Sequence, residues 1–422
     1  MNKIFAIIYC FAPILVPATL RYLKWFKGLD ALGYKIDTLS IDPDSFDPPG
    51  KVLMDSSLTE LVPPSLTSHT VWSIEKNMLL KLIKENRIGH ILFYKLFEQR
   101  KIEWYLGAKK FLKRYDSHNI DVIFSSSKMD SSHVVGLYLK NKTQKPWIAY
   151  FSDPWVGNPY TAWPSKKIYR YNCELEKKVV ESADMLLFPT EEMVHLALDS
   201  YPEQVIRKAR VLPHCFVPEW YTLSTREKLE EKGKKVRVVH AGNFYGPRTP
   251  LPLLRNLVKL KNEIKDISEK IEFQFYGGLE EKYKSFIYEN KLDDVVSILG
   301  SVPYMQSLNV MKNADYLIMI DAPLTSTKES VFLPLKLIDY IGSYNPVIGL
   351  TPEKGASATV LKKTGNIPCD VGHDDAIREV LKRLVEHVVI KPKRDAIDAY
   401  NYKTVTKNLS DFMTQVAGNG VR

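Results

Sequence analysis

The sequence, 422 residues long, contains few cysteines and no long apolar run. Its four cysteines are scattered without a C-x-x-C pair, which excludes a disulfide scaffold and a cysteine-based zinc site. No stretch reaches about 18 apolar residues without a charge or a helix breaker, so no membrane-spanning helix is expected. The apolar start, MNKIFAIIYCFAPILVPATL, has two prolines and no small-residue cleavage site, which favours a buried strand over a signal peptide. These absences predict a cytoplasmic protein.

Several signatures of nucleotide, hydrolase and metal chemistry are also missing. No G-x-G-x-x-G follows the first predicted strand, and there is no G-x-x-x-x-G-K-[ST] phosphate loop. No G-x-S-x-G nucleophile elbow occurs. The histidines and carboxylates do not cluster at metal-ligand spacings. We therefore predict neither a metal nor a cofactor.

Positive charge is only moderately in excess over negative charge. Lys and Arg number 59 against 49 Asp and Glu, a surplus of 10. This surplus suits an anionic partner, either a membrane surface or a phosphorylated substrate, and does not by itself indicate a nucleic-acid binder. Apolar residues make up 45% of the chain, which excludes wholesale disorder, and the length predicts two or three domains.

Short apolar runs alternate with helical patterns along nearly the whole chain, which is typical of α/β proteins with parallel, doubly wound sheets. The first series of expected strands is 3–11, 34–41, 121–127, 146–153, 184–190 and 210–214. The second series is 236–242, 271–277, 295–300, 315–321 and 345–350. We predict an N-terminal domain at 1–216, a charged hinge at 217–235, a C-terminal domain at 236–395, and a segment at 396–422 whose helix packs back on the N-terminal domain.

Ligands of open parallel sheets bind at the carboxyl ends of the strands, so the loops after strands are the candidate sites. In HAGNFYGPRTP (240–250), Gly242 allows a ligand close to the backbone, and the planar fork of Arg248 suits phosphate oxygens. In VFLPLKLIDYIGSYNPVIGL (331–350), a helix is expected from Leu335, directly after Pro334. The alternative is an ordinary glycine–proline loop and a plain crossover helix.

The same helix start carries two charged candidates. Lys336, beside the free amides of the first helical turn, could hold an anion such as a phosphate. Asp339 lies one turn deeper and could accept hydrogen bonds from sugar hydroxyls. A solvated Lys–Asp pair is the alternative.

Two candidates follow strands of the first domain. His133 sits near a predicted helix start, where a neutral ring could hydrogen-bond a hydroxyl. Asp153 ends a strand in YFSDPWVGNPY (150–160), where it could act as a base or bind an acceptor. The alternative is that Asp153 caps a turn while Trp155 packs.

These loops together resemble a GT-B glycosyltransferase, and most of all glycosyltransferase family 4. The resemblance covers nearly the whole chain. WIAYFSDPWVGNP is similar to the D-P-W loop of relatives that build bacterial surface polysaccharides, lipopolysaccharide or capsule. HAGNFYGPR and FLPLKLIDYIGSYNPVIGL resemble the donor-diphosphate loop and the donor-binding helix, and they are the most specific segments. The implied fold is two Rossmann-like doubly wound domains that face each other across a cleft.

The resemblance implies transfer of a sugar from a nucleotide-sugar, with a UDP-sugar favoured over a GDP-sugar, to a lipid-linked or surface-polysaccharide acceptor. It implies that Arg248, Lys336 and Gly242 bind the donor diphosphate, with the backbone at Pro334 and Leu335. Asp339 would bind the donor ribose. His133 would contact the donor sugar, and Asp153 would lie on the acceptor side. Retention without a metal is the expected chemistry.

The sequence departs from the family pattern at two places, which leaves other functions open. The first of the family's two donor-segment glutamates aligns with Val331, while Glu329 is out of register, and Asp339 replaces the second. The usual Gly-Gly after the first strand is absent. The alternatives are an inverting GT-B enzyme with Asp153 as general base, a nucleotide-sugar 2-epimerase, and a non-catalytic GT-B module that binds a nucleotide-sugar or a partner.

Basic residues concentrate in one segment. Residues 76–115 hold eleven Lys or Arg and three Glu, a local surplus of eight, interleaved with aliphatic and aromatic residues. This pattern predicts helices at an anionic membrane surface, which suits a peripheral protein on the inner face of the cytoplasmic membrane. The alternative is a pair of amphipathic helices packed on the first domain.

Overall fold

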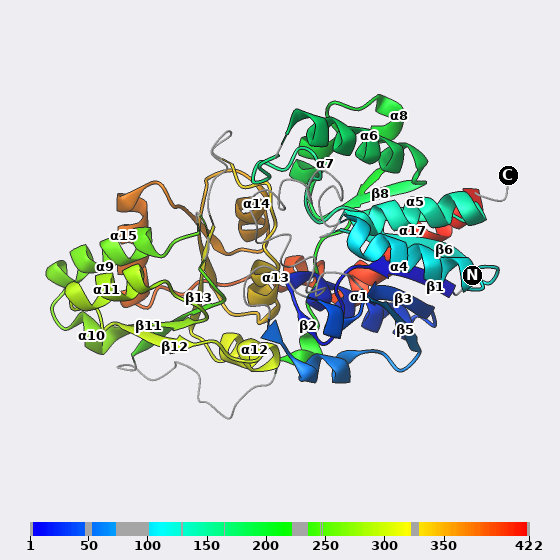
Figure 1. Ribbon diagram of the computed structural model, residues 1–422. Helices are drawn as coiled ribbons and strands as arrows, with labels where there is room; N and C mark the ends of the chain where they lie inside the picture. The colour runs from blue at the N-terminus through cyan, green and yellow to red at the C-terminus, as the bar shows by residue number, and fades with distance from the viewer. Residues whose placement is uncertain are drawn as a thin grey trace. The chain divides into compact units, whose positions relative to one another are not determined.

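The structure is a computed structural model that describes residues 3–46, 53–72, 101–127, 130–163, 165–221, 235–244, 246, 248–321 and 329–419. The chain divides into two compact units (Figure 1). Unit 1 comprises Met1–Pro213 and Tyr402–Arg422, and unit 2 comprises His214–Asn401. Most of the predicted hinge, residues 222–234, lies outside the described residues.

Unit 1 is built on a parallel sheet with the strand order β5-β3-β1-β6-β7-β8-β9. Its strands are β1 (Lys3–Ile8), β3 (Lys35–Ile41), β5 (Leu66–Val71), β6 (Val122–Ser126), β7 (Trp147–Tyr150), β8 (Met185–Phe188) and β9 (Ala209–Val211). A small antiparallel pair is formed by β2 (Ile14–Leu15) and β4 (Leu53–Met54). The helices are α1 (Pro17–Ala31), α4 (Lys101–Arg114), α5 (Ser131–Thr143), α6 (Lys166–Ser182), α7 (Glu191–Leu198), α8 (Glu203–Ile206) and α17 (Tyr402–Asn419).

The central strands of this sheet are buried on both faces, which explains why they stand out in the sequence as continuous apolar runs. Strand β1 pairs with β3 and β6, and five of its six residues are buried. Strand β5, which the sequence analysis missed, lies at the edge, and its sequence LTSHTV is mostly polar and solvent-accessible. An edge strand with one open side has no need of an apolar run, so it carries little signal.

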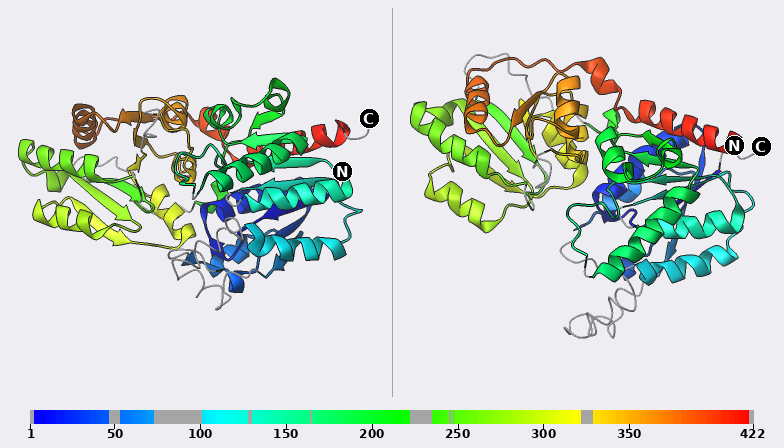
Figure 2. Two further views of the ribbon diagram at one scale, coloured as in Figure 1. Left: turned by 45° about the horizontal axis from the view of Figure 1, so that its top comes forward. Right: turned by 90° about the horizontal axis from the view of Figure 1, so that it is seen from above.

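Helix α17 packs against α1 within unit 1 (Figure 2). The two helices approach so closely that a Cβ atom added to Gly28 would lie 2.3 Å from Thr406 Oγ1. A hydrogen bond of 2.7 Å also joins the hydroxyls of Tyr34 and Ser410. The contact ties α17, near the C-terminus, to α1, the helix that precedes β3.

Unit 2 contains a parallel sheet with the order β12-β11-β10-β13-β14-β15. Its strands are β10 (Val236–Ala241), β11 (Ile271–Tyr276), β12 (Val296–Gly300), β13 (Tyr316–Ile320), β14 (Val347–Thr351) and β15 (Ile367–Asp370). The helices are α9 (Leu251–Glu263), α10 (Ile267–Lys270), α11 (Glu281–Glu289), α12 (Tyr304–Lys312), α13 (Leu335–Gly342), α14 (Ala356–Lys363), α15 (Asp374–Val385) and α16 (Arg394–Asp398). Residues of β10, β11, β13, α9 and α15 form one continuous apolar core.

The strand order of unit 2 is the Rossmann order, in which the sheet is wound outward from β10 in both directions. Unit 1 follows the same scheme with one additional strand. The predicted fold class, two Rossmann-like doubly wound domains, is therefore confirmed. In such a sheet, the adjacent carboxyl ends of β10 and β13 mark the point where the winding reverses and where ligands bind.

Candidate functional site

The loop after β10 places backbone where a side chain would not fit. Gly242 has a φ of +135°, and its amide donates to the carbonyl of Tyr276 at 2.7 Å. A Cβ atom on Gly242 would lie 3.1 Å from Lys336 Nζ. On the other side of the loop, a Cβ atom on Gly277 would lie 2.5 Å from the carbonyl oxygen of Gly242. The glycine at 242 thus makes room for the Lys336 ammonium.

Helix α13 is fastened to the end of β10 by one tyrosine. The Tyr340 hydroxyl accepts from the Ala241 amide at 2.7 Å and lies 3.1 Å from the Ala241 carbonyl oxygen, to which it can donate. Lys336 is one helical turn before Tyr340, so this bond sets the ammonium beside Gly242. Pro334 forms the N-cap and Leu335 is the first helical residue, as the sequence predicted.

The Lys336 ammonium sits in a positive and partly desolvated environment. The pKa of Lys336 is lowered to about 8, chiefly by burial and then by the positive charge of Arg248, while the negative charge of Asp321 acts in the opposite direction. Lys336 Nζ also contacts the carbonyl oxygen of Asn243 at 3.5 Å. An anion bound here would interact with both cations, and its negative charge would raise the pKa of the Lys336 ammonium again.

Arg248 is held by a wholly buried carboxylate. Its Nε donates to Asp321 Oδ1 at 2.9 Å, and the Asp321 side chain is 0% exposed. The other carboxylate oxygen, Oδ2, accepts from the hydroxyls of Ser330 at 2.5 Å and Ser357 at 2.7 Å. Ser357 lies in the first turn of α14, where the helix dipole favours a negative charge.

The structure therefore brings together Gly242, Arg248 and Lys336, three of the residues predicted to bind the donor diphosphate. They lie at the carboxyl side of β10 and at the start of α13. The arrangement can hold a multiply charged anion, because it presents a guanidinium, an ammonium and a helix N-terminus. The role itself stays a prediction.

Asp339, predicted to bind a ribose, lies in a different setting. Its side chain is 3% exposed, and Oδ2 accepts from the Tyr304 hydroxyl at 3.2 Å. Its backbone carbonyl accepts from Tyr221 at 2.8 Å. Burial raises the pKa of both tyrosines well above the ordinary value, and the Asp339 charge adds to the effect. The carboxylate is thus part of a buried tyrosine cluster, and its contact with a ribose stays a prediction.

His133 is a core residue of unit 1. Its ring is 0% exposed, shares a 2.8 Å hydrogen bond with Ser125 Oγ, and lies 4.3 Å from the ring of Phe151 between centroids. Burial lowers the pKa of His133 to about 3, so the ring is neutral near pH 7. The predicted contact with a donor sugar has no support here, because the ring has no exposed surface. The neutral state predicted for this ring agrees with its low pKa.

Asp153 lies on a half-buried loop that α6 holds in place. Asp153 Oδ2 accepts from Ser152 Oγ at 2.9 Å. Trp155 is 3% exposed, and its indole donates to Asn172 Oδ1 at 3.0 Å. The next amide, that of Val156, donates to Glu176 at 2.7 Å. Trp155 packs as the alternative interpretation expected, while Asp153 keeps a partly exposed carboxylate.

A buried cation that the sequence did not single out lies near this loop. The Arg21 side chain is 4% exposed and donates to Ser127 O at 3.0 Å. The same carbonyl oxygen lies 3.0 Å from Ser152 Oγ, whose single hydroxyl proton can be donated either to it or to Asp153, and this contact links α1 to the Asp153 loop. The guanidinium carbon lies 4.9 Å from the centre of the Tyr150 ring. An arginine in an apolar helix stretch is the only sequence signal for this network.

Asp321 is the residue of unit 2 that the sequence analysis missed. The predicted strand 315–321 ends at this carboxylate, so its position after a strand was a usable signal. Its serine partners gave none, because they come from separate segments.

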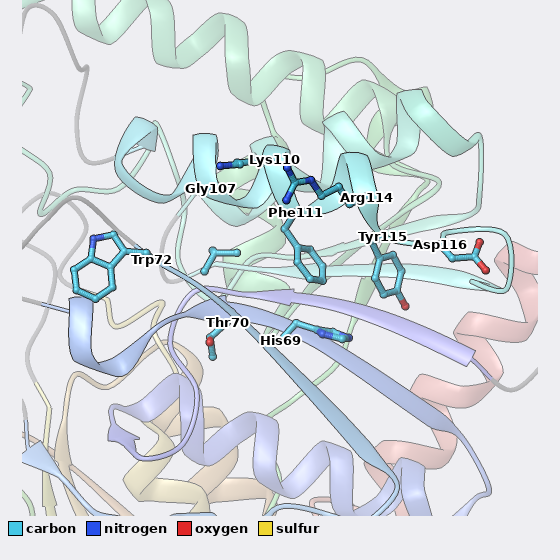
Figure 3. A pocket seen from close by; sticks show the side chains of 10 residues that line it. His69, Thr70, Trp72, Gly107, Lys110, Phe111, Arg114, Tyr115 and Asp116 are labelled. Carbon is cyan, nitrogen blue, oxygen red and sulfur yellow. The ribbon is translucent and has the colours of Figure 1, made fainter.

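A pocket of about 720 Å³ opens in unit 1 between the end of β5 and helix α4 (Figure 3). It is lined by His69, Trp72, Lys110, Phe111 and Arg114, among others. Figure 3 shows Lys110 and Arg114 on the helix and Trp72 toward one end of the pocket. None of the predicted site residues lines it.

The described part of the basic segment 76–115 is helix α4 with the residue after it; 76–100 lie outside the described residues. Trp104, Ala108 and Leu112 form a stripe that is 0% exposed, so this face packs on unit 1. Lys110, Lys113 and Arg114 are exposed, whereas Lys109 is half-buried over the Tyr138 ring. The packed face matches the amphipathic alternative, and the exposed cations remain available to a surface.

Among the described residues, no group of three or more His, Cys, Asp or Glu side chains is placed to hold a metal ion. No described helix has the length and apolar character needed to cross a membrane.

Comparison with known proteins identifies the fold. No protein-family model matches the sequence, and no curated protein matches it. Sucrose-phosphate synthase from Thermosynechococcus elongatus has a similar structure, with a TM-score of 0.65 and 13% identity over 99% of this chain and 100% of that chain. Anabaena HepE in complex with UDP and glucose gives a TM-score of 0.60 and 12% identity over 99% of each chain.

The lipopolysaccharide outer core galactosyltransferase WaaB gives a TM-score of 0.61 and 12% identity over 98% of this chain and 99% of that chain. These similarities span nearly the whole of each chain, so they include the elements of both units. The chain has the GT-B fold of these structures.

Proposed function

We propose that the protein is a glycosyltransferase that moves a sugar from a nucleotide-diphosphate-sugar to a lipid-linked or surface-polysaccharide acceptor. The observation that carries the proposal is the pairing of Arg248 and Lys336 at the winding reversal of unit 2. Two cations beside a glycine loop and a helix start are the groups that a diphosphate needs. The GT-B fold, shared with enzymes that transfer sugars, supports the same reading.

The cations have a defined task in this reaction. When the bond between the sugar and the diphosphate breaks, negative charge builds up on the departing phosphate oxygen. Arg248 and Lys336 stabilise this charge because they are already positioned before the reaction begins. The proposal includes no metal, since the side chains and the start of α13 supply the positive charge.

The donor is proposed to be a UDP-sugar. The HepE structure was determined with UDP and glucose, which supports uridine over guanosine. Asp339 is retained as the proposed ribose ligand, since it follows Lys336 on the same helix. A bacterial polysaccharide, of the lipopolysaccharide or capsule type, is the proposed product class, and WaaB supports it.

Asp153 is proposed to act in unit 1, on the acceptor. Its partly exposed carboxylate is fixed by Ser152, and the loop is fastened to α6. Such a carboxylate can take a proton from a hydroxyl. Retention of the anomeric configuration is the proposed stereochemistry. Inversion, with Asp153 as the general base, is the second candidate. The partly exposed Asp153 carboxylate supports this second candidate, because it can accept a proton from a hydroxyl.

The donor proposal is tested by melting curves with a panel of UDP- and GDP-sugars. A ligand present at about 100 times its Kd adds about 2.7 kcal/mol of stability, which is easily seen. Lys336→Met should reduce this stabilisation to about half or less, and Lys362→Met, which changes an exposed lysine of the same unit, should preserve it. Stabilisation that is equal in both variants would contradict the diphosphate site.

Slow reaction of the stabilising nucleotide-sugar separates the three enzyme classes. Release of the free sugar with its anomeric configuration retained supports the main proposal, and inversion supports Asp153 as base. Conversion to the 2-epimer would identify an epimerase. Binding without any reaction, even with a polysaccharide acceptor, would favour the non-catalytic alternative.

A peripheral membrane position is proposed through the exposed cations of α4. Each basic residue near an anionic leaflet contributes about 1 kcal/mol. Lys110→Glu with Lys113→Glu should reduce sedimentation with anionic vesicles at low salt. Lys177→Glu on α6, where the lysine side chain is 65% exposed, is the control and should leave sedimentation unchanged. Equal recovery of wild-type protein with neutral and anionic vesicles would discard the idea.

A further inference from the structure

The negative charge of Asp321 lies beside the two cations of the proposed anion site, where it disfavours an anion. The carboxylate lies directly beyond β13, wholly buried, and pairs with Arg248 at 2.9 Å. A negative charge beside two cations cancels part of their attraction for an anion. A site selected only for anion affinity would not contain it.

The surroundings of Asp321 show that the carboxylate is fixed from two further segments. Ser330 and Ser357 both donate to Oδ2, which leaves Oδ1 directed at Arg248 Nε. Ser330 is itself fastened, because its carbonyl accepts from the Ala356 amide at 2.7 Å and a Cβ on Gly355 would lie 2.2 Å from that carbonyl oxygen. The carboxylate therefore has one place and one orientation.

A fixed carboxylate in turn fixes the guanidinium. A free arginine side chain loses rotamer freedom when it is ordered, which costs free energy. If Asp321 orders it before the ligand arrives, the ligand does not bear that cost, and the fork is already aimed when charge develops on the phosphate. The benefit of a guanidinium that is ordered before binding therefore offsets the attraction for an anion that the negative charge of Asp321 cancels.

We propose that Asp321 is the positioning residue of the anion site in unit 2: held by Ser330 and Ser357, it aims Arg248 at a diphosphate. This inference rests on the proposed function, and it adds a residue and a role that the resemblance to glycosyltransferases does not provide. Asp321 itself does not touch the ligand in this proposal.

The test compares two substitutions that change the charge equally. Asp321→Asn and Asp321→Ala both remove one negative charge, but only the amide keeps an oxygen that can accept from Arg248 Nε. Pyrophosphate binding to the full chain is measured by calorimetry at one pH and one salt concentration. We expect the Asn variant to bind pyrophosphate at least about 10-fold more tightly than the Ala variant, in line with the loss of one charged hydrogen bond.

Equal pyrophosphate affinity of the two variants would overturn the inference and leave the proposed function intact. Failure of the wild-type protein to bind pyrophosphate would overturn the diphosphate site and, with it, the role of Asp321. The two failures are therefore distinguishable. Thermal melting of each variant checks that it is folded.

A milder pair of variants serves if Asp321→Ala does not fold. Ser357→Ala keeps the charge of Asp321 and removes one of its supports, and it should weaken pyrophosphate binding by about 3- to 10-fold. Ser297→Ala is the matched control, because Ser297 also donates to a carboxylate, that of Glu272, at 2.7 Å in the same sheet. Unchanged affinity in Ser357→Ala, or an equal loss in the control, would refute the positioning role.

Discussion

Replacing Gly242 by alanine should displace the Lys336 ammonium and thereby weaken anion binding. The added Cβ atom would lie 3.1 Å from Nζ and 3.3 Å from Cε of Lys336, which is closer than ordinary van der Waals contact. Because Tyr340 clamps α13 to Ala241, the helix cannot simply move away. The flexible end of the lysine must move instead, by a few tenths of an ångström or into another rotamer.

The expected loss follows from one charge-assisted contact. A hydrogen bond from a charged group contributes about 1.5–3 kcal/mol, so losing the Lys336 contact with a phosphate should weaken binding by about 10- to 150-fold. The backbone strain of alanine at a φ of +135° costs a further 1–3 kcal/mol or so, but this cost falls on folding and not on binding.

The assay is calorimetric titration of the purified protein with UDP and with pyrophosphate, accompanied by a melting curve. Gly246→Ala is the matched control, because Gly246 belongs to the same loop and has a φ of +56°, yet nothing lies within 4 Å of its added Cβ. The control should lose stability and keep its affinity. Wild-type affinity in Gly242→Ala, or an equal loss in both variants, would refute the reasoning.

Three further predictions concern protonation and packing. UDP affinity should fall as the pH rises through about 8, because the pKa of Lys336 is lowered to about 8 and only the protonated ammonium attracts the diphosphate. An affinity that is unchanged up to pH 9.5 would contradict this prediction. Between pH 6.5 and 4.5 the buried neutral ring of His133, with its pKa lowered to about 3, should cost about 2 kcal/mol of unfolding free energy, since the unfolded chain takes up the proton. In urea titrations, the unfolding free energy of His133→Gln should fall less at acid pH than that of the wild-type protein. His195→Gln is the control and should behave like the wild-type protein, because the His195 side chain is 71% exposed. Gly28→Ala should lower the unfolding free energy by about 1–3 kcal/mol through its clash with α17, whereas Gly418→Ala, with nothing within 4 Å, should be neutral or stabilising; equal melting temperatures would refute the close packing.

Most of the fold could be predicted because buried parallel strands and amphipathic helices leave a local pattern in the sequence. The run 236–242 is predicted as a strand and forms β10, Val236–Ala241, and the helix predicted to begin at Leu335 forms α13, Leu335–Gly342. The edge strand β5 left no such pattern, since half-exposed positions accept polar residues. The candidate loops were selected on a related ground, because ligand-binding loops follow strands in this kind of sheet, and their role stays a prediction.

The sequence by itself thus determined the doubly wound class, and it placed a glycine–arginine loop after one strand and a lysine at a helix start as separate candidates. Only the tertiary structure decided which groups meet. The support of Arg248 by Asp321 depends on Ser330 and Ser357, which lie 9 and 36 residues from that carboxylate along the chain. The burial of His133 depends on Ser125 and Phe151, on neighbouring segments of the sheet. Local periodicity records which face of an element is buried, but contacts between distant segments depend on how the whole chain packs, and no local pattern records them.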